Sequence, residues 1–182
     1  LPDLLAAACD AEHLSFADAR FDVALIGLGL FIFPQPEKAL AELHRVLRPG
    51  GRIALSVWGQ REAVPLIARA QDCIARLLPA PKVPRPSVFR LGEVNALAAL
   101  LGQTGFGEVS ITPHTFTCTF ASADDYWQAF LDLAGGAAES LSRLPAAMQS
   151  RLRAEVASEI ASHREADGFA IQSTVLIATA TR

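Results

Sequence analysis

The 182-residue sequence predicts an α/β fold built on a parallel sheet, and three observations indicate this fold class. A continuous apolar run occupies residues 21–33, a helix-like pattern follows at residues 37–47, and a second apolar run occupies residues 52–58. Strand, helix and strand in this order form a βαβ unit. Its two strands lie parallel because the helix carries the chain back across the sheet.

Each element of this unit has its own signal. The run at residues 21–33 lacks the alternation of a half-exposed strand, which is typical of a strand buried on both faces, and prolines at 34 and 36 end it. The helix at residues 37–47 repeats apolar residues at helical spacing, namely Ala39, Leu40, Leu43, Val46 and Leu47. The segment Arg48-Pro49-Gly50-Gly51 predicts a turn before the next strand. We also expect a short first strand at residues 4–8.

Length predicts one domain whose core is residues 1–60. Residues 61–90 form a helical excursion, in which a helix at 63–78 precedes a proline-rich return. Residues 91–182 supply the remaining helix and edge strands, with helices inserted at 124–164. A helix is expected at 92–104 and strands at 109–120 and 170–181, and these two strands are expected to pair antiparallel.

Composition excludes several classes of protein. The net charge of -3, from 16 Lys and Arg against 19 Asp and Glu, gives no basic footprint for nucleic acid. Three separated cysteines with no CxxC pair indicate neither a disulfide framework nor a metal site, and fit a reducing cytoplasm. The longest apolar run is shorter than the roughly 20 residues of a membrane helix. No Walker A loop, GxSxG elbow, HExxH helix or Tyr-x-x-x-Lys pair is present.

The ends of three predicted strands should meet at one sheet edge, where open α/β sheets bind ligands. These ends are residues 9–13, 27–33 and 56–59. Asp10 can accept a hydrogen bond from an exocyclic amine while the Ala11 N–H donates to a ring nitrogen, which suits adenine; alternatively, Asp10 caps a turn. Gly27 and Gly29 indicate close approach of another group to the backbone, or helix packing against the sheet.

The ordered set of residues 10–16 (DAEHLSF), 21–23 (FDV) and 43–59 (LHRVLRPGGRIALSVWG) resembles the ubiquinone/menaquinone-biosynthesis type of class I S-adenosylmethionine-dependent methyltransferase domain. The resemblance is close over residues 9–59 and looser beyond them. It implies a Rossmann-like, three-layer α/β/α sheet of seven strands, with helical lid insertions. Residues 1–60 would be the carboxy-terminal part of the cofactor-binding core.

The resemblance also implies a site and a substrate class. S-adenosyl-L-methionine would bind at the strand ends and its methyl group would pass to a small-molecule acceptor. Asp10 would meet the adenine amino group and Ala11 the ring nitrogen, while Gly27, Leu28 and Gly29 would line the methionine and ribose side.

The family's glycine-rich loop has no counterpart here, because residues 1–20 contain no glycine. The sequence also starts Leu1-Pro2-Asp3 without an initiator Met, so we expect an N-terminally truncated domain that lacks a central strand. The open sheet edge would then be covered by the missing segment or by a second copy of the chain in a homo-oligomer. A non-catalytic binding or interaction module is the alternative function.

Methyl transfer from a sulfonium is an in-line displacement, to which alignment alone contributes ~7–11 kcal/mol, so no catalytic residue is assigned. The histidines that could serve as a general base are His13, His44, His114 and His163. His44 is expected to lie on the helix between the two strands as a surface or packing residue, and His13 lies nearest the predicted site but has a structural alternative. Phe31, Trp58, Phe89 and Trp127 are candidates for lining a mostly apolar acceptor pocket, and the same aromatics could instead be core.

Overall fold

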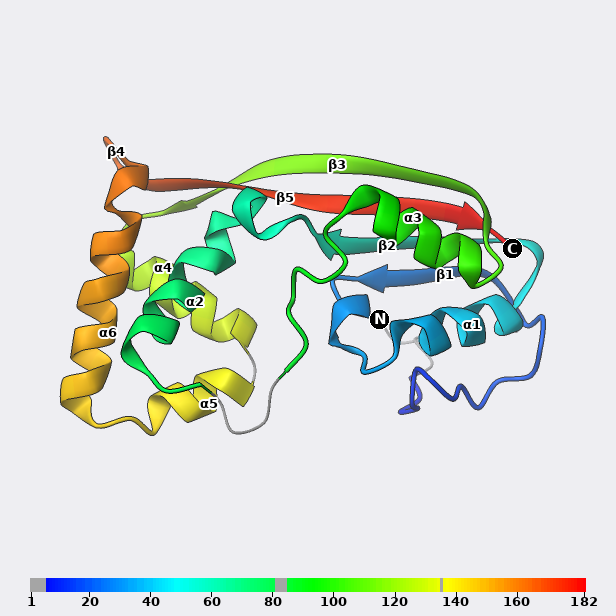
Figure 1. The fold of residues 1–182 in the computed structure, drawn as a ribbon, viewed down its shortest axis with the longest axis horizontal. Coiled ribbons are helices and arrows are strands. Elements are labelled where there is room, and N and C mark those ends of the chain that lie inside the picture. The colour runs from blue at the N-terminus through cyan, green and yellow to red at the C-terminus, as the bar shows by residue number, and fades with distance from the viewer. Residues whose placement is uncertain (1–5, 81–84, 135) are drawn as a thin grey trace. The chain divides into compact units, whose positions relative to one another are not determined.

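The computed structural model describes residues 6–80, 85–134 and 136–182 (Figure 1). The chain divides into two compact units. Unit 1 comprises Leu1–Gln60, Pro86–His114 and Val175–Arg182, and unit 2 comprises Arg61–Arg85 and Thr115–Thr174. The long strands β3 (Gly107–Phe120) and β5 (Gly168–Thr181) contribute residues to both units.

Unit 1 contains the predicted βαβ motif. Strand β1 (Phe21–Gly27) leads through a short 3₁₀ turn, η1 (Leu30–Ile32), into helix α1 (Pro36–Val46), which returns the chain to β2 (Leu47–Trp58). β1 and β2 are parallel, as predicted, and β5 pairs antiparallel with β2. The sheet order is β1-β2-β5-β3, so β5 also lies beside β3 as expected.

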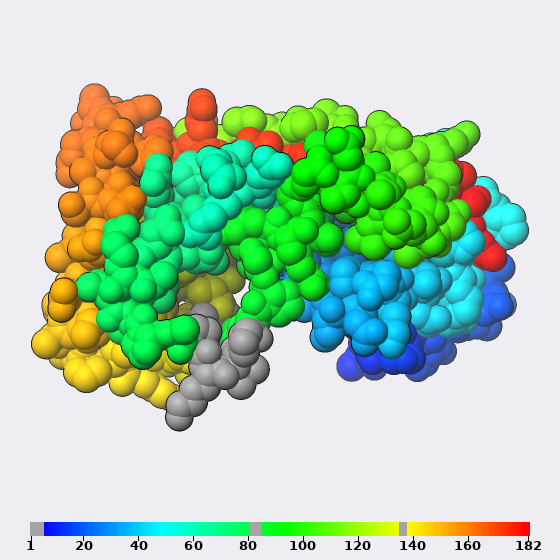
Figure 2. All heavy atoms as spheres, in the orientation of Figure 1, coloured from blue at the N-terminus to red at the C-terminus, as the bar shows by residue number. Residues whose placement is uncertain are grey.

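Apolar periodicity explains the packing of unit 1. Alternate residues of β2 (Ile53, Leu55 and Val57) are buried, as are Ala39 and Leu40 of α1. Helix α3 (Val94–Gln103) buries Leu97 and Leu101, and Glu93 caps it by accepting bonds from two backbone N–H groups, those of Asn95 and Ala96. His44 of α1 packs against Phe106, which follows α3, and the blue and green segments that contain these helices adjoin in the space-filling view (Figure 2).

Unit 2 is mainly helical. It contains η2 (Arg61–Ala63), α2 (Pro65–Leu77), α4 (Ala123–Ala134), α5 (Gly136–Ser142), α6 (Ala146–Glu159), η3 (Ile160–His163) and the short strand β4 (Arg164–Glu165), which pairs with β5. Tyr126 is fully buried, and its hydroxyl donates to the Leu66 carbonyl at 2.9 Å. Within the described ranges, no helix is long and apolar enough to cross a membrane.

Three expectations need correction. Residues 6–8 form no strand, because these exposed residues have no described strand beside them to complete a ladder, while residues 4–5 lie outside the described part of the chain. The turn expected before the strand is present at residues 48–51, with Gly50 at a φ of +77°, but it lies inside β2, because β1 pairs Phe21 with Leu47 and Val23 with Arg52. Gly50 N–H donates to the Arg182 carbonyl and Arg182 N–H to the Gly51 carbonyl. The described sheet has five strands, whereas the resemblance implies seven.

The free edge of β1 is apolar. Among the described residues β1 pairs only with β2. Leu25 is 76% exposed, Val23 56% and Phe21 38%, although the continuous apolar run predicts a strand buried on both faces. An open edge therefore lies beside the candidate site.

Candidate functional site

The carboxyl ends of β1 and β2 lie side by side, as the βαβ prediction requires. Gly27 pairs with Ser56 in the parallel register. The next residue, Leu28, has a φ of +46°, which lies in the left-handed region of backbone conformation that residues other than glycine rarely adopt. Its N–H donates to both the carbonyl oxygen and the Oγ of Ser56, each at 3.1 Å. Ser56 therefore holds the chain in a sharp turn as it leaves the sheet.

The two glycines flanking Leu28 have different surroundings. A Cβ atom placed on Gly27 would meet nothing within 4 Å, so no protein group packs against it. A Cβ atom on Gly29 would lie 3.3 Å from Ile26 Cγ2, a close contact with a neighbouring side chain. Gly27 thus leaves open space at the strand end, whereas Gly29 fits against the strand that precedes it.

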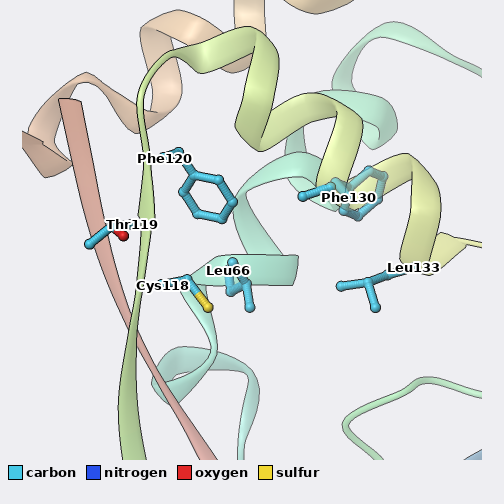
Figure 3. Close-up of a pocket in the computed structure, with 7 residues that line it drawn as sticks. Leu66, Cys118, Thr119, Phe120, Phe130 and Leu133 are labelled. Carbon is cyan, nitrogen blue, oxygen red and sulfur yellow. The ribbon is translucent and has the colours of Figure 1, made fainter.

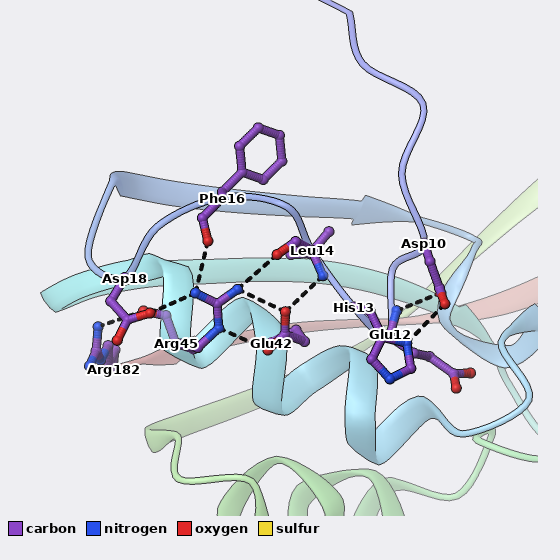
Figure 4. Close-up of polar contacts among 9 residues, drawn as sticks. All are labelled: Asp10, Glu12, His13, Leu14, Phe16, Asp18, Glu42, Arg45 and Arg182. Atoms are coloured by element: carbon purple, nitrogen blue, oxygen red, sulfur yellow. Dashed lines mark hydrogen bonds and ion pairs between the residues drawn. The ribbon is translucent and has the colours of Figure 1, made fainter.

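Asp10 lies in a compact turn (Figure 4). Its Oδ1 accepts the Glu12 N–H at 2.9 Å, its Oδ2 lies 2.9 Å from His13 Nδ1, and its backbone carbonyl accepts the His13 N–H at 3.1 Å. These are the contacts of a turn cap, so the alternative interpretation of Asp10 is realised. The Asp10 side chain is nevertheless 63% exposed, and a carboxylate with two acceptors engaged keeps further lone pairs for a ligand.

A polar clamp, consisting of Glu42 and Arg45 on helix α1, holds the chain that follows this turn (Figure 4). Glu42 Oε2 accepts the Leu14 N–H at 2.7 Å. Arg45 Nη2 donates to the Leu14 carbonyl at 2.9 Å, and Nη1 donates to the Phe16 carbonyl at 2.8 Å. Arg45 also pairs with Glu42 at 2.8 Å and with Asp18 at 2.6 Å.

The clamp carries fixed charges. The Arg45 guanidinium lowers the pKa of Glu42 from 4.5 to about 2, and Glu42 in turn raises the pKa of Arg45. The hydrogen bond from His13 is the largest cause that lowers the pKa of Asp10, followed by the Glu12 N–H. All three groups therefore keep their charges at neutral pH, and Asp10 presents a carboxylate.

Three of the four aromatic candidates belong to segments that meet in unit 1. Phe31 is buried in η1, which follows β1, and Trp58 is buried at the end of β2. Phe89 is half-buried in a turn closed by a bond from Gly92 N–H to the Phe89 carbonyl at 2.9 Å. A Cβ atom on Gly92 would lie 2.3 Å from the Gly59 carbonyl group, so this turn presses against the end of β2. Arg90 of the same turn donates to the Phe33 carbonyl.

The fourth candidate, Trp127, lies in unit 2. It is buried in α4 and stacked on Phe130, with ring centroids 5.5 Å apart. A neighbouring cavity of about 320 Å³ is lined by residues of α2, β3 and α4 that the sequence did not single out as a group (Figure 3): Leu66, Cys118, Thr119, Phe120, Ala129, Phe130 and Leu133. Burial raises the pKa of the Cys118 thiol, so this lining carries no charge at neutral pH.

The histidines occupy different settings. The His44 ring packs edge-on against Phe106 at 5.2 Å between centroids and lies 3.0 Å from where a Cβ on Gly105 would be, which confirms its packing role. His13 is bonded to Asp10. His163 in unit 2 is part-buried, and burial lowers its pKa. The described residues contain no group of three or more His, Cys, Asp or Glu that could hold a metal ion.

Comparison with solved structures shows the fold. The chain matches the YcgJ protein of Bacillus subtilis with a TM-score of 0.55, at 14% identity, over 96% of this chain and 69% of that one. It also matches Haemonchus contortus phosphoethanolamine N-methyltransferase 2, solved with phosphomonomethylethanolamine and S-adenosylhomocysteine, with a TM-score of 0.50 at 14% identity over 96% and 36% of the two chains. The fold is the Rossmann-like fold of class I methyltransferases.

The sequence relatives identify the family more closely. Residues 3–55 match the family described as a methyltransferase domain. Over 47 residues the chain is 47% identical to the ubiquinone/menaquinone biosynthesis C-methyltransferase of Ralstonia pickettii (strain 12J), covering 26% of this chain and 19% of that protein. Over 89 residues it is 39% identical to the demethylmenaquinone methyltransferase of Clavibacter sepedonicus, covering 49% and 34%. The chain therefore matches about a fifth to a third of these relatives' length.

Proposed function

We propose that this chain takes part in S-adenosylmethionine-dependent methyl transfer to a small-molecule acceptor. The observation that carries the proposal is the Asp10 turn, which lies within the matched family segment and presents an exposed carboxylate held in its charged form. In this assignment Asp10 accepts a hydrogen bond from the adenine amino group, and the Ala11 N–H donates to a ring nitrogen.

The end of β1 supports the other half of the cofactor site. The open space at Gly27 and the sharp turn at Leu28 are suited to a ligand that passes close to the backbone. We assign Gly27, Leu28 and Gly29 to the methionine and ribose side. The hydrogen bond that the Gln35 N–H donates to Glu12 Oε1, at 2.8 Å, links the Asp10 turn to the segment that follows these residues.

Positioning is sufficient for the chemistry of such a site. Displacement at the sulfonium methyl needs the acceptor in line with the breaking bond, and S-adenosylhomocysteine leaves as a neutral thioether. A proton need be removed only when the acceptor is a hydroxyl or an acidic carbon, and no general base is assigned.

For the acceptor, we propose a molecule with a neutral, apolar portion. Phe31, Trp58 and Phe89 provide aromatic surface in unit 1, and Trp127 does so in unit 2 beside the uncharged cavity that contains Cys118 and Phe130. Cavities of a few hundred Å³ lined by apolar side chains are typical of small-molecule sites.

Calorimetric titration with S-adenosylhomocysteine tests the cofactor assignment. We expect Asp10→Ala to weaken binding at least ~10-fold, because a hydrogen bond to a charged group is worth ~1.5–3 kcal/mol. Asp22→Ala is the matched control, since Asp22 is an equally exposed acid that pairs with Arg48 at 2.6 Å. Equal binding by both variants would refute the role of Asp10. A folded wild-type chain that binds no ligand would favour a non-catalytic interaction module.

A further inference from the structure

We propose that Glu42 and Arg45 are positioning residues that orient the Asp10 carboxylate and thereby set the selectivity of the site for adenine over a purine without the amino group. This inference rests on the proposed cofactor role of Asp10. The two residues that would set the selectivity lie on helix α1, whereas Asp10 lies in the turn near the start of the chain.

The loop after Asp10 has little apolar packing of its own. Between residues 10 and 20 every side chain is exposed or half-exposed, and Phe16 is 37% exposed. Backbone and side-chain hydrogen bonds must therefore fix its path. Glu42 and Arg45 supply three of these to main-chain groups of the loop, the N–H and carbonyl of Leu14 and the carbonyl of Phe16.

The hydrogen bonds made by residue 45 need the shape of an arginine side chain. The two terminal nitrogens of Arg45 donate to carbonyls two residues apart, while Nε and Nη2 donate to the two oxygens of Glu42 at 2.8 Å each. A planar guanidinium can make this set of bonds at once, whereas a lysine ammonium has one nitrogen and no fork.

The clamp is connected to Asp10 through the neighbouring residues of the turn. Leu14, which both clamp residues hold, directly follows His13, and His13 bonds to the Asp10 side chain and carbonyl. On the other side of the turn, Glu12 is tied to Gln35 and donates its own N–H to Asp10 Oδ1. The Asp10 carboxylate is thus oriented by Glu12 and His13, whose positions are fixed from both directions.

Helix α1, which carries both clamp residues, is held firmly in unit 1. Helix α1 buries Ala39, Leu40 and Val46. The backbone carbonyl of Arg45 also accepts bonds from the Ala19 N–H at 3.0 Å and from Arg182 Nη1 at 3.2 Å. The loop is therefore anchored to the core of unit 1. This anchor can keep the hydrogen-bond geometry at Asp10 within the small tolerance that selectivity for adenine needs.

The test compares two ligands, S-adenosylhomocysteine and its deaminated analogue S-inosylhomocysteine, whose purine has an oxygen in place of the amino group. We expect the wild-type chain to prefer the adenine ligand at least ~10-fold. Arg45→Lys and Glu42→Gln should reduce this preference to less than about threefold, mainly by weakening the adenine ligand. Arg48→Lys is the matched control, because Arg48 forms an exposed ion pair with Asp22 and makes none of the loop contacts.

A second measurement, amide hydrogen exchange at Glu12 and Leu14 in the ligand-free chain, does not depend on the cofactor. We expect exchange to rise at least ~10-fold in Arg45→Lys and to stay unchanged in Arg48→Lys. Unchanged exchange in Arg45→Lys would overturn the clamp. An equal loss of affinity for both ligands would show a structural role only, and would also overturn the proposal. If the folded wild-type chain binds neither ligand, the cofactor assignment fails and the selectivity role fails with it, while exchange still decides whether the clamp holds the turn.

Discussion

The two units hold their candidate ligand-binding surfaces by different means. In unit 1 the Asp10 turn is exposed and is fixed by charged and backbone hydrogen bonds from α1. In unit 2 the wall of the cavity is fixed by burial, because Tyr126 is fully buried, packs edge-on against Phe120 at 5.4 Å and donates to the Leu66 carbonyl, while Ser173 Oγ accepts the Leu66 N–H at 3.2 Å. Hydrogen bonds at the exposed turn can be removed without loss of core packing. Removing a buried side chain from the cavity wall necessarily loses core packing.

Each unit contains one of the two tryptophans, which allows this difference to be measured. Trp58 lies in unit 1 and Trp127 in unit 2. A Trp127→Phe background therefore reports the unfolding of unit 1 by fluorescence, and a Trp58→Phe background reports the unfolding of unit 2.

The largest expected effect is in unit 2. Phe130→Ala should lower the free energy of unfolding by ~3–5 kcal/mol, because it removes a buried ring and leaves a cavity beside Trp127. Denaturant unfolding followed by Trp127 fluorescence measures it. Gln128→Ala, at an exposed position on the same helix, is the control and should change stability by less than ~0.5 kcal/mol. A loss below ~1 kcal/mol for Phe130→Ala would mean that burial does not hold this wall.

The next effect depends on pH and should separate the two units. Because Arg45 lowers the pKa of folded Glu42 from 4.5 to about 2, its stabilising contribution is complete above pH 4.5 and is lost as the pH falls toward 2. Burial lowers the pKa of folded His163, so unit 2 should begin to lose stability at a higher pH, just below 6.5, where the unfolded chain takes up the proton first.

Thermal unfolding between pH 7 and 3, followed with the separate tryptophans, measures these two losses. Glu42→Gln should flatten the acid limb of unit 1, and His163→Gln should flatten that of unit 2. Identical pH profiles for the parent chain and its two variants would contradict the assignment of the charges.

The smallest effect distinguishes backbone strain from strand packing within unit 1. Leu28→Gly should stabilise the chain by less than ~1 kcal/mol, because glycine removes the ~1–2 kcal/mol penalty of the left-handed conformation but adds ~0.5–1 kcal/mol of chain entropy. The same substitution at Leu25, an exposed strand residue, should destabilise it by ~0.5–1 kcal/mol. Denaturant midpoints followed by Trp58 give both values, and a destabilising Leu28→Gly would show that the Leu28 side chain outweighs its strained backbone.

The sequence predicts the repetitive parts of the fold well. The βαβ unit, α3 and the strands at residues 109–120 and 170–181 follow from apolar periodicity and β-branched residues, and helices lie within residues 124–164 as expected. The irregular parts are predicted only in part. The turn at residues 48–51 has a sequence signal and is present, but its place inside β2 depends on hydrogen bonds to the distant Arg182, which no local pattern indicates.

The candidate site shows the same division. The proximity of the strand ends at Gly27 and Ser56 follows from topology. The left-handed Leu28 has no sequence signal, since leucine gives no indication of a positive φ. Glu42 and Arg45 do have a signal, because an acidic and a basic residue three positions apart pair on one helix face. Their bonds to the backbone of Leu14 and Phe16 depend on the loop path and cannot be read from residue types.

The free edge of β1 has a practical consequence for handling the protein. Among the residues that the structure describes, the outer edge of β1 has no partner strand, and Phe21, Val23 and Leu25 are exposed on one face of this strand. Such an edge is a template for strand addition, so the colloidal behaviour of this chain should depend on concentration more than its charge of -3 would indicate. A single Lys at position 25 would act as a gatekeeper, since it places an ammonium group where a strand from another molecule would dock.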